Sequence, residues 1–257
     1  MGYVFAEESD IERTPLTGLE AMFDPITTDV LARLGVGLGW RCAEVAAGGG
    51  SIAWWLADQV GHTGQVVATD VDIRHLTALE APNVQVLCHD VTVEDCPGKP
   101  FDLVHARALV EHLPHRTNVL ERLASWVRPG GWLVIEDCDW TTRFPVTAAP
   151  VFEKVVTASL DYACTTFAYD TAFGRTLPTL LSEMGLVDIG CEARSRLTQG
   201  GSAEAQFWIH TIERVQDALV AGGLLTEDEA VTAMAVHEDP SFVTMAPTLV
   251  SAWGRVL

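Results

Sequence analysis

Residues 41–51 read RCAEVAAGGGS and carry the clearest structural signal in the chain. The run RCAEVA (41–46) is apolar and predicts a strand, whereas SIAWWLADQV (51–60) has apolar residues at helical spacing. Three glycines between them permit a tight turn and a close approach of the main chain to a ligand. The N-terminus of the following helix offers unpaired N–H groups. We therefore expect a strand–turn–helix unit with a ligand site at the turn.

The alternation of strands and helices continues beyond this turn. Pro129-Gly130-Gly131 is expected to separate a helix from the strand that follows it. The βαβ pattern predicts an α/β, Rossmann-like fold, with a seven-stranded, mostly parallel sheet, helices on both faces and a helical substrate-lid insertion. Ligands on such sheets bind beside the carboxyl ends of the strands. The further strands are predicted at 65–70, 84–90, 101–107, 132–137, 191–197 and 248–256, and the further helices at 73–80, 116–127, 148–170 and 202–222.

The organisation of the chain follows from the segments around this core. Asp24 and Pro25 are expected to start a helix as N-cap and first helical residue, and Gly35 to end it. No Pro/Gly/Ser-rich linker interrupts the sequence, which favours one domain. The predicted domain covers 1–257, with N-terminal helices in 1–40, a cofactor-binding core in 41–140 and helical lid insertions in 141–175 and 200–240.

Charge and cysteine spacing exclude several classes of function. Lys and Arg total 16 and Asp and Glu total 35, a formal net charge of −19, which argues against nucleic-acid and anionic membrane surfaces. The six cysteines form no C-x-x-C pair, so zinc and redox sites are not expected. No apolar signal peptide or membrane span is visible. We expect a cytoplasmic protein with a small-molecule partner, and the sequence leaves its oligomeric state open.

Acidic residues at strand ends indicate which ligand the turn binds. Asp70 ends the second strand, 20 residues after Gly50, where a carboxylate can accept both hydroxyls of a ribose. The spacing Gly48-x-Gly50-x-x-Ala53 also satisfies the dinucleotide fingerprint, so a nicotinamide cofactor is an alternative. Two further acids point to another nucleoside: Glu44 lies inside the first strand, and Asp90, at the end of the third, could bind an adenine amino group.

Five segments in order then resemble the class I S-adenosylmethionine-dependent methyltransferases, especially bacterial small-molecule enzymes of the ubiquinone-biosynthesis and natural-product type. The resemblance covers about residues 40–140. One departure is Ala46, because the family usually has glycine there, and a methyl group narrows the space beside the methionine moiety. The segments are Glu44-x-Ala46-x-Gly48-x-Gly50, ATDVD with Asp70, HDV at 89–91, FDLVHARALVEHLP at 101–114 and RPGGWLVIED at 128–137.

The resemblance implies a cofactor, S-adenosyl-L-methionine, and a product, S-adenosyl-L-homocysteine. Glu44 would order the glycine turn, Asp70 would hold the ribose and Val71 would pack on the adenine. An acidic protein suits a cofactor that is cationic at sulfur. The implied cofactor-binding residues are Glu44, Ala46, Ala47, Gly48, Gly50, Ser51, Asp70, Val71, Asp90, Val91, Ala106 and Arg107.

Transfer to an oxygen or carbon acceptor requires a base at the carboxyl ends of the strands. His112, in VEHLP, is one candidate, because histidine titrates near neutral pH; a structural histidine at a turn is the alternative. Asp137 and Asp139 after the fifth strand are the other catalytic candidates, with a loop or capping role as the alternative for Asp139. The sequence offers no convincing third ligand for a metal beside these acids, so no metal is expected.

Aromatic residues concentrate in the two predicted insertions. Apolar pockets with few polar groups suit flat organic substrates, although most such residues belong to a helical core. The candidate substrate-binding residues are Trp140, Tyr162, Phe167, Tyr169, Phe207 and His210.

These features favour methylation of a small, hydrophobic or aromatic metabolite, most simply on a hydroxyl oxygen. Nitrogen and carbon acceptors stay open. A methyltransferase-fold protein that binds the cofactor but catalyses a cyclisation or rearrangement is the first alternative. A nicotinamide-dependent oxidoreductase is the second, and it is disfavoured because Lys154 has no tyrosine partner at Tyr-x-x-x-Lys spacing.

Overall fold

The computed structural model describes residues 13–76, 79, 81–167 and 169–257, with side chains from residue 16 onward. The first part of the predicted N-terminal region and residues 77, 78 and 80 of the predicted helix 73–80 lie outside these ranges. The elements are α1 (Arg13–Arg33), β1 (Arg41–Val45), α2 (Ser51–Val60), β2 (Gln65–Asp70), η2 (Ile73–His75), β3 (Val84–Cys88), β4 (Phe101–Arg107), η3 (Val110–His112), α3 (Arg116–Trp126), β5 (Val127–Asp139), η4 (Trp140–Thr142), β6 (Phe144–Pro145), α4 (Pro150–Phe167), η5 (Phe173–Thr176), α5 (Leu177–Glu183), β7 (Val187–Arg194), β8 (Leu197–Gln199), α6 (Ala203–Ala221), α7 (Glu227–Glu238), β9 (Val243–Met245) and β10 (Thr248–Arg255).

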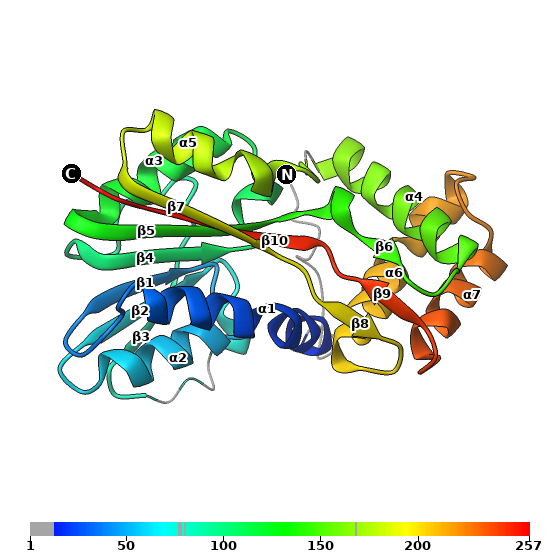
Figure 1. Cartoon of the computed structure of the whole chain (residues 1–257), viewed down its shortest axis with the longest axis horizontal. Helices are drawn as coiled ribbons and strands as arrows, with labels where there is room; N and C mark the ends of the chain where they lie inside the picture. Colours follow the sequence, from blue (N-terminus) through cyan, green and yellow to red (C-terminus); the bar gives the residue numbers. More distant parts are fainter. Residues whose placement is uncertain (1–12, 77–78, 80, 168) are drawn as a thin grey trace. The chain divides into compact units, whose positions relative to one another are not determined.

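The main sheet has seven strands in the order β3-β2-β1-β4-β5-β10-β7 (Figure 1). The pairs β2–β3, β1–β2, β1–β4 and β4–β5 are all parallel. Val256 pairs with Gly130 and Gly131 while Ser251 bonds to Glu136, so β10 runs antiparallel to β5. β7 is in turn antiparallel to β10. The predicted Rossmann-like, mostly parallel seven-stranded sheet is confirmed.

Helices cover both faces of this sheet (Figure 1). On one face, Leu120 of α3 and Leu177 of α5 are fully buried against strand residues such as Val104. On the other face, Leu31 of α1 and Leu56 of α2 form a second core with alternate strand positions. Because side chains alternate between faces along a strand, each central strand supplies apolar side chains to both cores.

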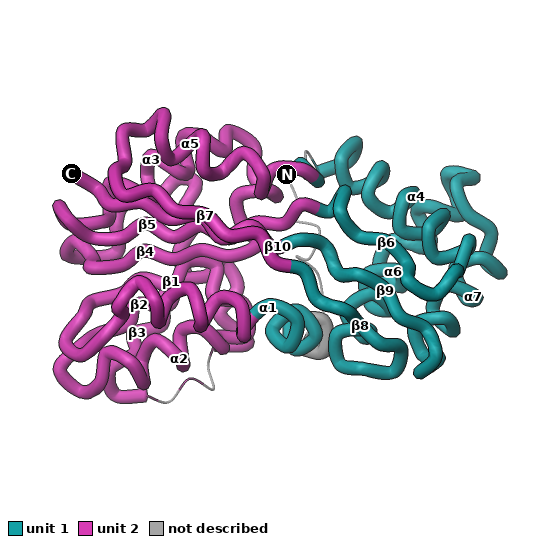
Figure 2. Tube along the Cα trace, viewed as in Figure 1, with its two compact units in different colours: residues 1–23, 140–171, 195–248 teal, residues 24–139, 172–194, 249–257 magenta. Residues whose placement is uncertain are grey.

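The described residues divide into two compact units (Figure 2). The sheet unit comprises 24–139, 172–194 and 249–257. The helical unit comprises the described residues up to Phe23, together with 140–171 and 195–248. Inside the helical unit, α4, α6 and α7 share a small apolar core, and β6, β9 and β8 form a three-stranded antiparallel sheet. The two predicted insertions fall almost entirely within this second unit, and the assignment of one domain stays a prediction.

The start of the first helix was predicted wrongly. α1 begins before Asp24 and continues through Pro25, which lies inside the helix. Proline has no N–H to donate to the carbonyl four residues earlier, which is that of Ala21. Nη1 of Arg196 donates to this carbonyl at 3.5 Å, which gives it a partner in place of the missing N–H. The predicted end is confirmed, because Gly35 follows the helix with a φ of +86°.

Two predicted strand boundaries also differ from the structure. The predicted strand 191–197 is divided, since β7 belongs to the main sheet and β8 to the small one. Pro129-Gly130-Gly131 does not precede the fifth strand but forms a bulge within β5. Phe101 and Leu103 of β4 pair with Val127 and Trp132, which leaves the three bulge residues unpaired with β4.

Candidate functional site: the carboxyl edge of the sheet

The residues expected to bind the cofactor follow the ends of four strands. Because β3, β2, β1 and β4 are parallel neighbours, their carboxyl ends meet at one edge of the sheet. The turn 46–51 follows β1, Asp70 ends β2, Asp90 follows β3 and Arg107 ends β4. The structure therefore brings these positions to the same edge, within the sheet unit.

The glycine turn is tied directly to Asp70. The main-chain nitrogen of Gly48 donates to Oδ2 of Asp70 at 2.9 Å, and that of Asp72 donates to Oδ1 at 3.0 Å. Burial raises the pKa of the Asp70 carboxyl above its usual value, although these two main-chain donors favour the charged form. Each carboxylate oxygen has a further lone pair available for a ligand hydroxyl.

The turn itself adopts left-handed main-chain conformations. Ala46 has a φ of +56°, a region that a side chain with a Cβ rarely occupies. Ala46, which stands where the methyltransferase family usually has glycine, thus occupies a main-chain conformation that favours glycine. Gly50, with a φ of +84°, precedes α2 and provides no side chain to cap its first turn. The first N–H groups of α2 are therefore open to a ligand at this end.

The residues expected near the adenine differ in exposure. The side chain of Val71 is exposed, at 58% of its full accessible area, as an adenine-packing surface requires. Val91 is buried in the core, so only its main chain is available to a ligand. Oδ1 of Asp90 accepts hydrogen bonds from the nitrogen (2.8 Å) and hydroxyl (2.6 Å) of Thr92, which orders the loop after β3.

Asp24 of α1, which was expected only to cap a helix, joins two of the expected site residues. Oδ1 of Asp24 accepts hydrogen bonds from Nη2 of Arg107 at 2.8 Å and from the hydroxyl of Ser51 at 3.1 Å. Asp24 is therefore an internal helix residue that contacts two expected site residues, and not the N-cap that was predicted. Ala106 is buried in the core, so its side chain is not available to a ligand.

Among the described contacts, the side chain of Glu44 does not touch the glycine turn that it was expected to order. Its Oε2 lies 2.6 Å from Nδ1 of His105, and Nε2 of His105 lies 3.2 Å from Oε2 of Glu136. All three side chains are buried. Burial opposes protonation of His105, but the two carboxylates outweigh it and raise its pKa to about 9. His105 was not selected from the sequence, and the signal that could have found it is a histidine at a buried strand position.

The histidine proposed as a base has an unusual environment. Burial and the nearby Arg116 guanidinium lower the pKa of His112 to about 3. Its Nε2 lies 3.5 Å from Oε1 of the buried Glu111. The imidazole is thus neutral at pH 7 but a much weaker base than the near-neutral titration expected from the sequence.

Asp137, a second catalytic candidate, is fully buried. Its Oδ1 accepts a hydrogen bond from the nitrogen of Leu109 at 3.0 Å, and its Oδ2 has no partner among the described atoms. Burial and the negative charge of Glu111 raise the pKa of Asp137 well above its usual value. Glu111 in turn accepts a hydrogen bond from the nitrogen of Cys138 at 2.8 Å. Two buried carboxyl groups therefore lie where β4 and β5 end, and Glu111 was not selected from the sequence.

Asp139, the third candidate, forms an ion pair with Arg175. Nε of Arg175 donates to Oδ2 of Asp139 at 2.7 Å, and Nη2 contacts the same oxygen. A carboxylate held in this way has a structural role whether or not it also takes part in chemistry. In the described ranges, no group of three or more His, Cys, Asp or Glu side chains is arranged to hold a metal ion.

The candidate substrate-binding aromatics all lie in the helical unit and form two groups. Trp140 stacks on Phe207 with ring centroids 6.3 Å apart, and meets Tyr169 edge-on at 6.2 Å. Tyr162 and Phe167 form a separate edge-on pair at 5.8 Å. His210 faces Glu213, with Nδ1 2.7 Å from its Oε2. Trp140, Tyr169 and Phe207 are mostly buried, which is typical of a core as well as of a pocket wall.

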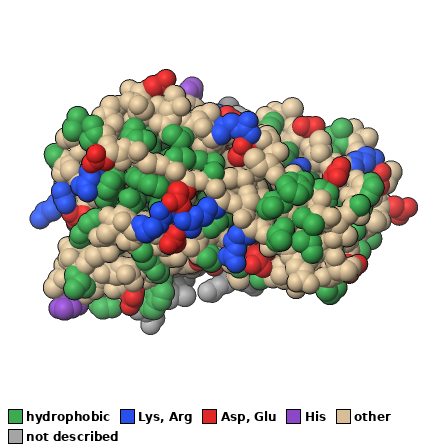
Figure 3. Space-filling view, viewed as in Figure 1, with side chains coloured by type: hydrophobic (Ala, Val, Ile, Leu, Met, Phe, Trp, Pro, Cys, Tyr) green, Lys and Arg blue, Asp and Glu red, His purple; other side chains and the backbone are tan. Residues whose placement is uncertain are grey.

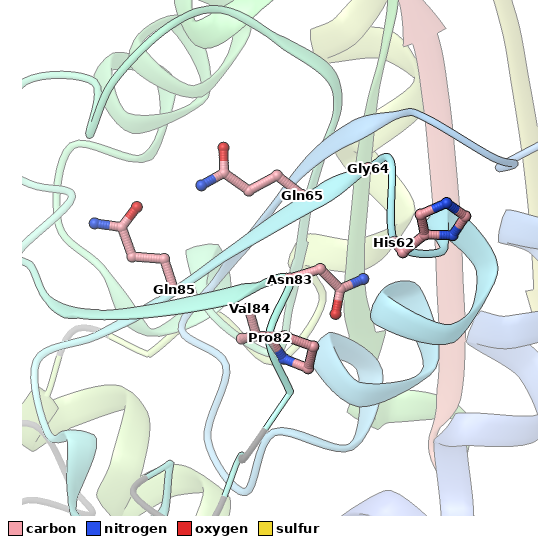
Figure 4. Close-up of a pocket in the computed structure, with 7 residues that line it drawn as sticks. All are labelled: His62, Gly64, Gln65, Pro82, Asn83, Val84 and Gln85. Carbon is pink, nitrogen blue, oxygen red and sulfur yellow. The ribbon is translucent and has the colours of Figure 1, made fainter.

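A surface hollow lies at the opposite edge of the sheet from these site residues (Figure 4). It opens at the amino ends of β2 and β3, and Gln65 and Gln85 extend to the same side of it. No acid, base or nucleophile other than His62 lines it, so it is not a second candidate for the reaction. Its lining residues are His62, Gly64, Gln65, Pro82, Asn83, Val84 and Gln85.

Surface charges on the face shown in Figure 3 are mixed, and basic side chains lie beside acidic ones. Among the ion pairs of the sheet unit, Arg194 pairs with Asp29 at 2.7 Å and with Glu192 at 2.5 Å. Within the described ranges, no helix has the length and apolar character needed to cross a membrane.

The sequence profile of the methyltransferase domain family matches residues 20–159, more than half of the chain. The chain therefore belongs to this family, as its strand-end motifs predict. The match extends from α1 through the whole carboxyl edge and into α4.

Known proteins resemble the chain over part of their length. The methyltransferase str2 of Strobilurus tenacellus is 34% identical over 145 residues, 55% of this chain and 51% of that protein. The ubiquinone biosynthesis O-methyltransferase of Paracidovorax citrulli is 33% identical over 106 residues, 37% of this chain and 42% of that protein. The chain thus spans about half the length of the curated relatives it matches. A solved Anabaena variabilis structure, described as a methyltransferase from an antibiotic biosynthesis pathway, shares the fold at a TM-score of 0.60 and 15% identity, covering 90% of this chain and 97% of that one.

Proposed function

We propose that this protein is an S-adenosyl-L-methionine-dependent methyltransferase whose acceptor is a hydroxyl oxygen on a small, hydrophobic or aromatic metabolite. The observation that carries the proposal is the contact between Gly48 and Asp70 at the carboxyl edge, in a chain of the methyltransferase domain family. The name of the Paracidovorax citrulli relative supports an oxygen acceptor. The cytoplasmic location expected from the cysteine spacing remains a prediction.

The residues at the carboxyl edge fit this cofactor. Gly50 has a φ of +84°, a main-chain conformation that favours glycine, and a Cβ there would displace the end of the Leu79 side chain, 2.3 Å away. The uncapped first turn of α2, the spare lone pairs of Asp70 and the exposed Val71 would hold its methionine, ribose and adenine parts. When bound, S-adenosyl-L-methionine supplies a methyl group on a sulfonium, which is a good leaving group.

The chain's own part in the reaction is to bind, to orient and to exclude water. The chain is least equipped to remove the proton of the acceptor, because His112, with a pKa of about 3, is a weak base. An acceptor whose hydroxyl is itself acidic, such as a phenol or a carboxylic acid, needs only a weak base. We therefore place phenols and aromatic acids first among candidate acceptors.

Parallel calorimetric titrations with S-adenosyl-L-methionine, S-adenosyl-L-homocysteine and NAD test the cofactor. Binding of the first two without NAD is expected, and binding of NAD alone would overturn the proposal. Methyl transfer from labelled cofactor to a panel of phenols, acids, amines and carbon acids then identifies the acceptor atom. Transfer to amines or carbon acids alone would overturn the oxygen acceptor while leaving the enzyme class in place.

A second candidate is a cofactor-binding protein that catalyses a cyclisation or rearrangement. The observation that favours it is the same low pKa of His112, since such chemistry does not require this base. Tight binding of S-adenosyl-L-homocysteine, with no methyl transfer to any class of acceptor in the panel, would favour this candidate over the first.

A further inference from the structure

A continuous chain of polar side chains connects helix α1 to both ends of the glycine turn. We call it the α1 network. It begins at Glu44, which precedes the turn, and ends at Ser51, which follows it. Its members, in order of contact, are Glu44, His105, Glu136, Thr27, Arg107, Asp24 and Ser51.

The first half of the network crosses the sheet beneath α1. Glu44, His105 and Glu136 lie on the adjacent strands β1, β4 and β5. Their strand neighbours Cys42, Leu103 and Val134, two residues away, belong to the core that α1 and α2 cover. Since side chains two residues apart share a face, the three polar side chains point toward these helices. An imidazolium between two carboxylates supplies one N–H donor to each.

The second half returns from the sheet to the glycine turn through α1. The hydroxyl of Thr27, which is fully buried, donates to Oε2 of Glu136 and accepts from Nη1 of Arg107 at 2.9 Å. Arg107 then pairs with Asp24, and Asp24 accepts the hydroxyl of Ser51. Among the contacts of the described residues, Thr27 links the two halves.

We propose that the α1 network is a positioning device for the cofactor site, so that cofactor affinity depends on Thr27 and His105, which are not among the residues expected to bind the cofactor. This inference rests on the proposed function. Its physical basis is that a buried polar network is stable only when every member has its partner. Loss of one link leaves buried donors and acceptors unpaired and favours rearrangement of the segments at both ends.

The charges around His105 support a protonated imidazole. Glu44 and Glu136 face it from the neighbouring strands, Ser251 on β10 and Thr27 on α1 bond to Glu136, and Arg107 and Asp24 compensate each other. Burial opposes a lower pKa for Glu136, but its hydrogen bond and charge interaction with His105 prevail and lower it. The ion pair of His105 and Glu136 is therefore charged at neutral pH.

Thr27 provides a matched pair of variants. Thr27→Val keeps the shape of the side chain and removes the hydroxyl, whereas Thr27→Ser keeps the hydroxyl. We expect Thr27→Val to weaken binding of S-adenosyl-L-homocysteine about tenfold or more, and Thr27→Ser to restore most of it. In turnover, KM for the cofactor should rise in Thr27→Val while kcat changes less. Thr244→Val, at a buried threonine of the helical unit, is the control and should leave affinity unchanged.

Hydrogen exchange of the protein without cofactor tests the same inference independently of cofactor binding. In Thr27→Val and in the harsher His105→Gln, peptides covering 44–51 and 24–33 should exchange faster, while the helical unit is unchanged. Exchange that rises uniformly, or a Thr27→Val protein that matches wild type in 44–51, would overturn the inference. If wild type fails to bind S-adenosyl-L-homocysteine, the proposed function fails, and the exchange pattern alone decides whether the network positions the turn.

Discussion

The main-chain nitrogen of Gly48 donates a 2.9 Å hydrogen bond to Oδ2 of Asp70, which joins the glycine turn after β1 to the end of β2. One carboxylate thus orders the turn and faces the position where a ribose is expected. Its second oxygen is ordered by the nitrogen of Asp72. Asp70 therefore links the glycine turn and the end of β2, the two parts of the expected nucleoside site.

Asp70→Asn should weaken binding of S-adenosyl-L-homocysteine by about 10–100-fold, because the amide places a donor opposite a main-chain N–H and removes a charged acceptor. Calorimetric titration at neutral pH measures the change. Asp72→Asn is the control, since the side chain of Asp72 bonds to Arg74 and its main-chain donor is kept. Equal affinity of Asp70→Asn and wild type would contradict a ribose contact.

Ala46→Gly should raise the free energy of unfolding by about 0.5–1 kcal/mol, because glycine accepts a positive φ without the penalty that alanine has there. The neighbouring Ala47, which is not among the residues with positive φ, provides the control. Ala47→Gly should lower the free energy of unfolding by a similar amount through the greater freedom of the unfolded chain. Urea denaturation of both variants checks the signs, and stabilisation by both would show that the strain at Ala46 is not the cause.

The His105 contacts predict a loss of stability at alkaline pH. The pKa of His105 is raised from 6.5 to about 9 in the folded protein, so the folded state binds the proton more tightly than the unfolded state. This contribution is complete below pH 6.5 and is lost as the pH rises through about 9. His105→Gln should cost about 3–5 kcal/mol at neutral pH, because it removes the positive charge that lies between two buried carboxylates. The free energy of unfolding of His105→Gln should also fall less than that of wild type as the pH rises through about 9. If denaturation experiments gave the two proteins the same dependence on pH, the assignment would be refuted.

Asp137 and Asp139 should respond in opposite ways to replacement by asparagine. Because the folded-state pKa of Asp137 is raised, its carboxyl lowers the free energy of unfolding as the pH rises above 3.8. Asp137→Asn removes this effect, so its stability relative to wild type should improve as the pH rises above 3.8. Asp139→Asn loses the ion pair with Arg175 and should be destabilised across the same range. Thermal denaturation at several pH values distinguishes the two, and parallel behaviour would contradict the raised pKa.

Much of the carboxyl edge could be predicted from sequence because its signals are local. The helix SIAWWLADQV was predicted at the bounds that α2 has, since its apolar residues and the preceding glycine act over a few residues. The strands 65–70 and 101–107 likewise coincide with β2 and β4. Asp70 was located because parallel strands place their carboxyl ends at one edge.

The errors arose where a distant segment changes the local preference. Pro25 is a good first helical residue, yet α1 continues through it, and Arg196, far along the chain, bonds to the carbonyl that proline leaves free. His112 was chosen for its ordinary pKa, which burial and Arg116 shift to about 3. The Arg196 contact and the burial of His112 both depend on segments that are distant in the sequence.

The order of strands and helices, the glycine turn and the acidic strand ends are properties of consecutive residues, so periodicity and spacing were enough to predict the class of fold and the edge that carries the site. The pairing of His105 with Glu44 and Glu136, and the link from Thr27 to both ends of the turn, join residues up to 109 positions apart. Such contacts depend on which strands become neighbours and which helix covers them. Electrostatic environment follows burial and proximity in space, and these exist only once the sheet and its helices have packed.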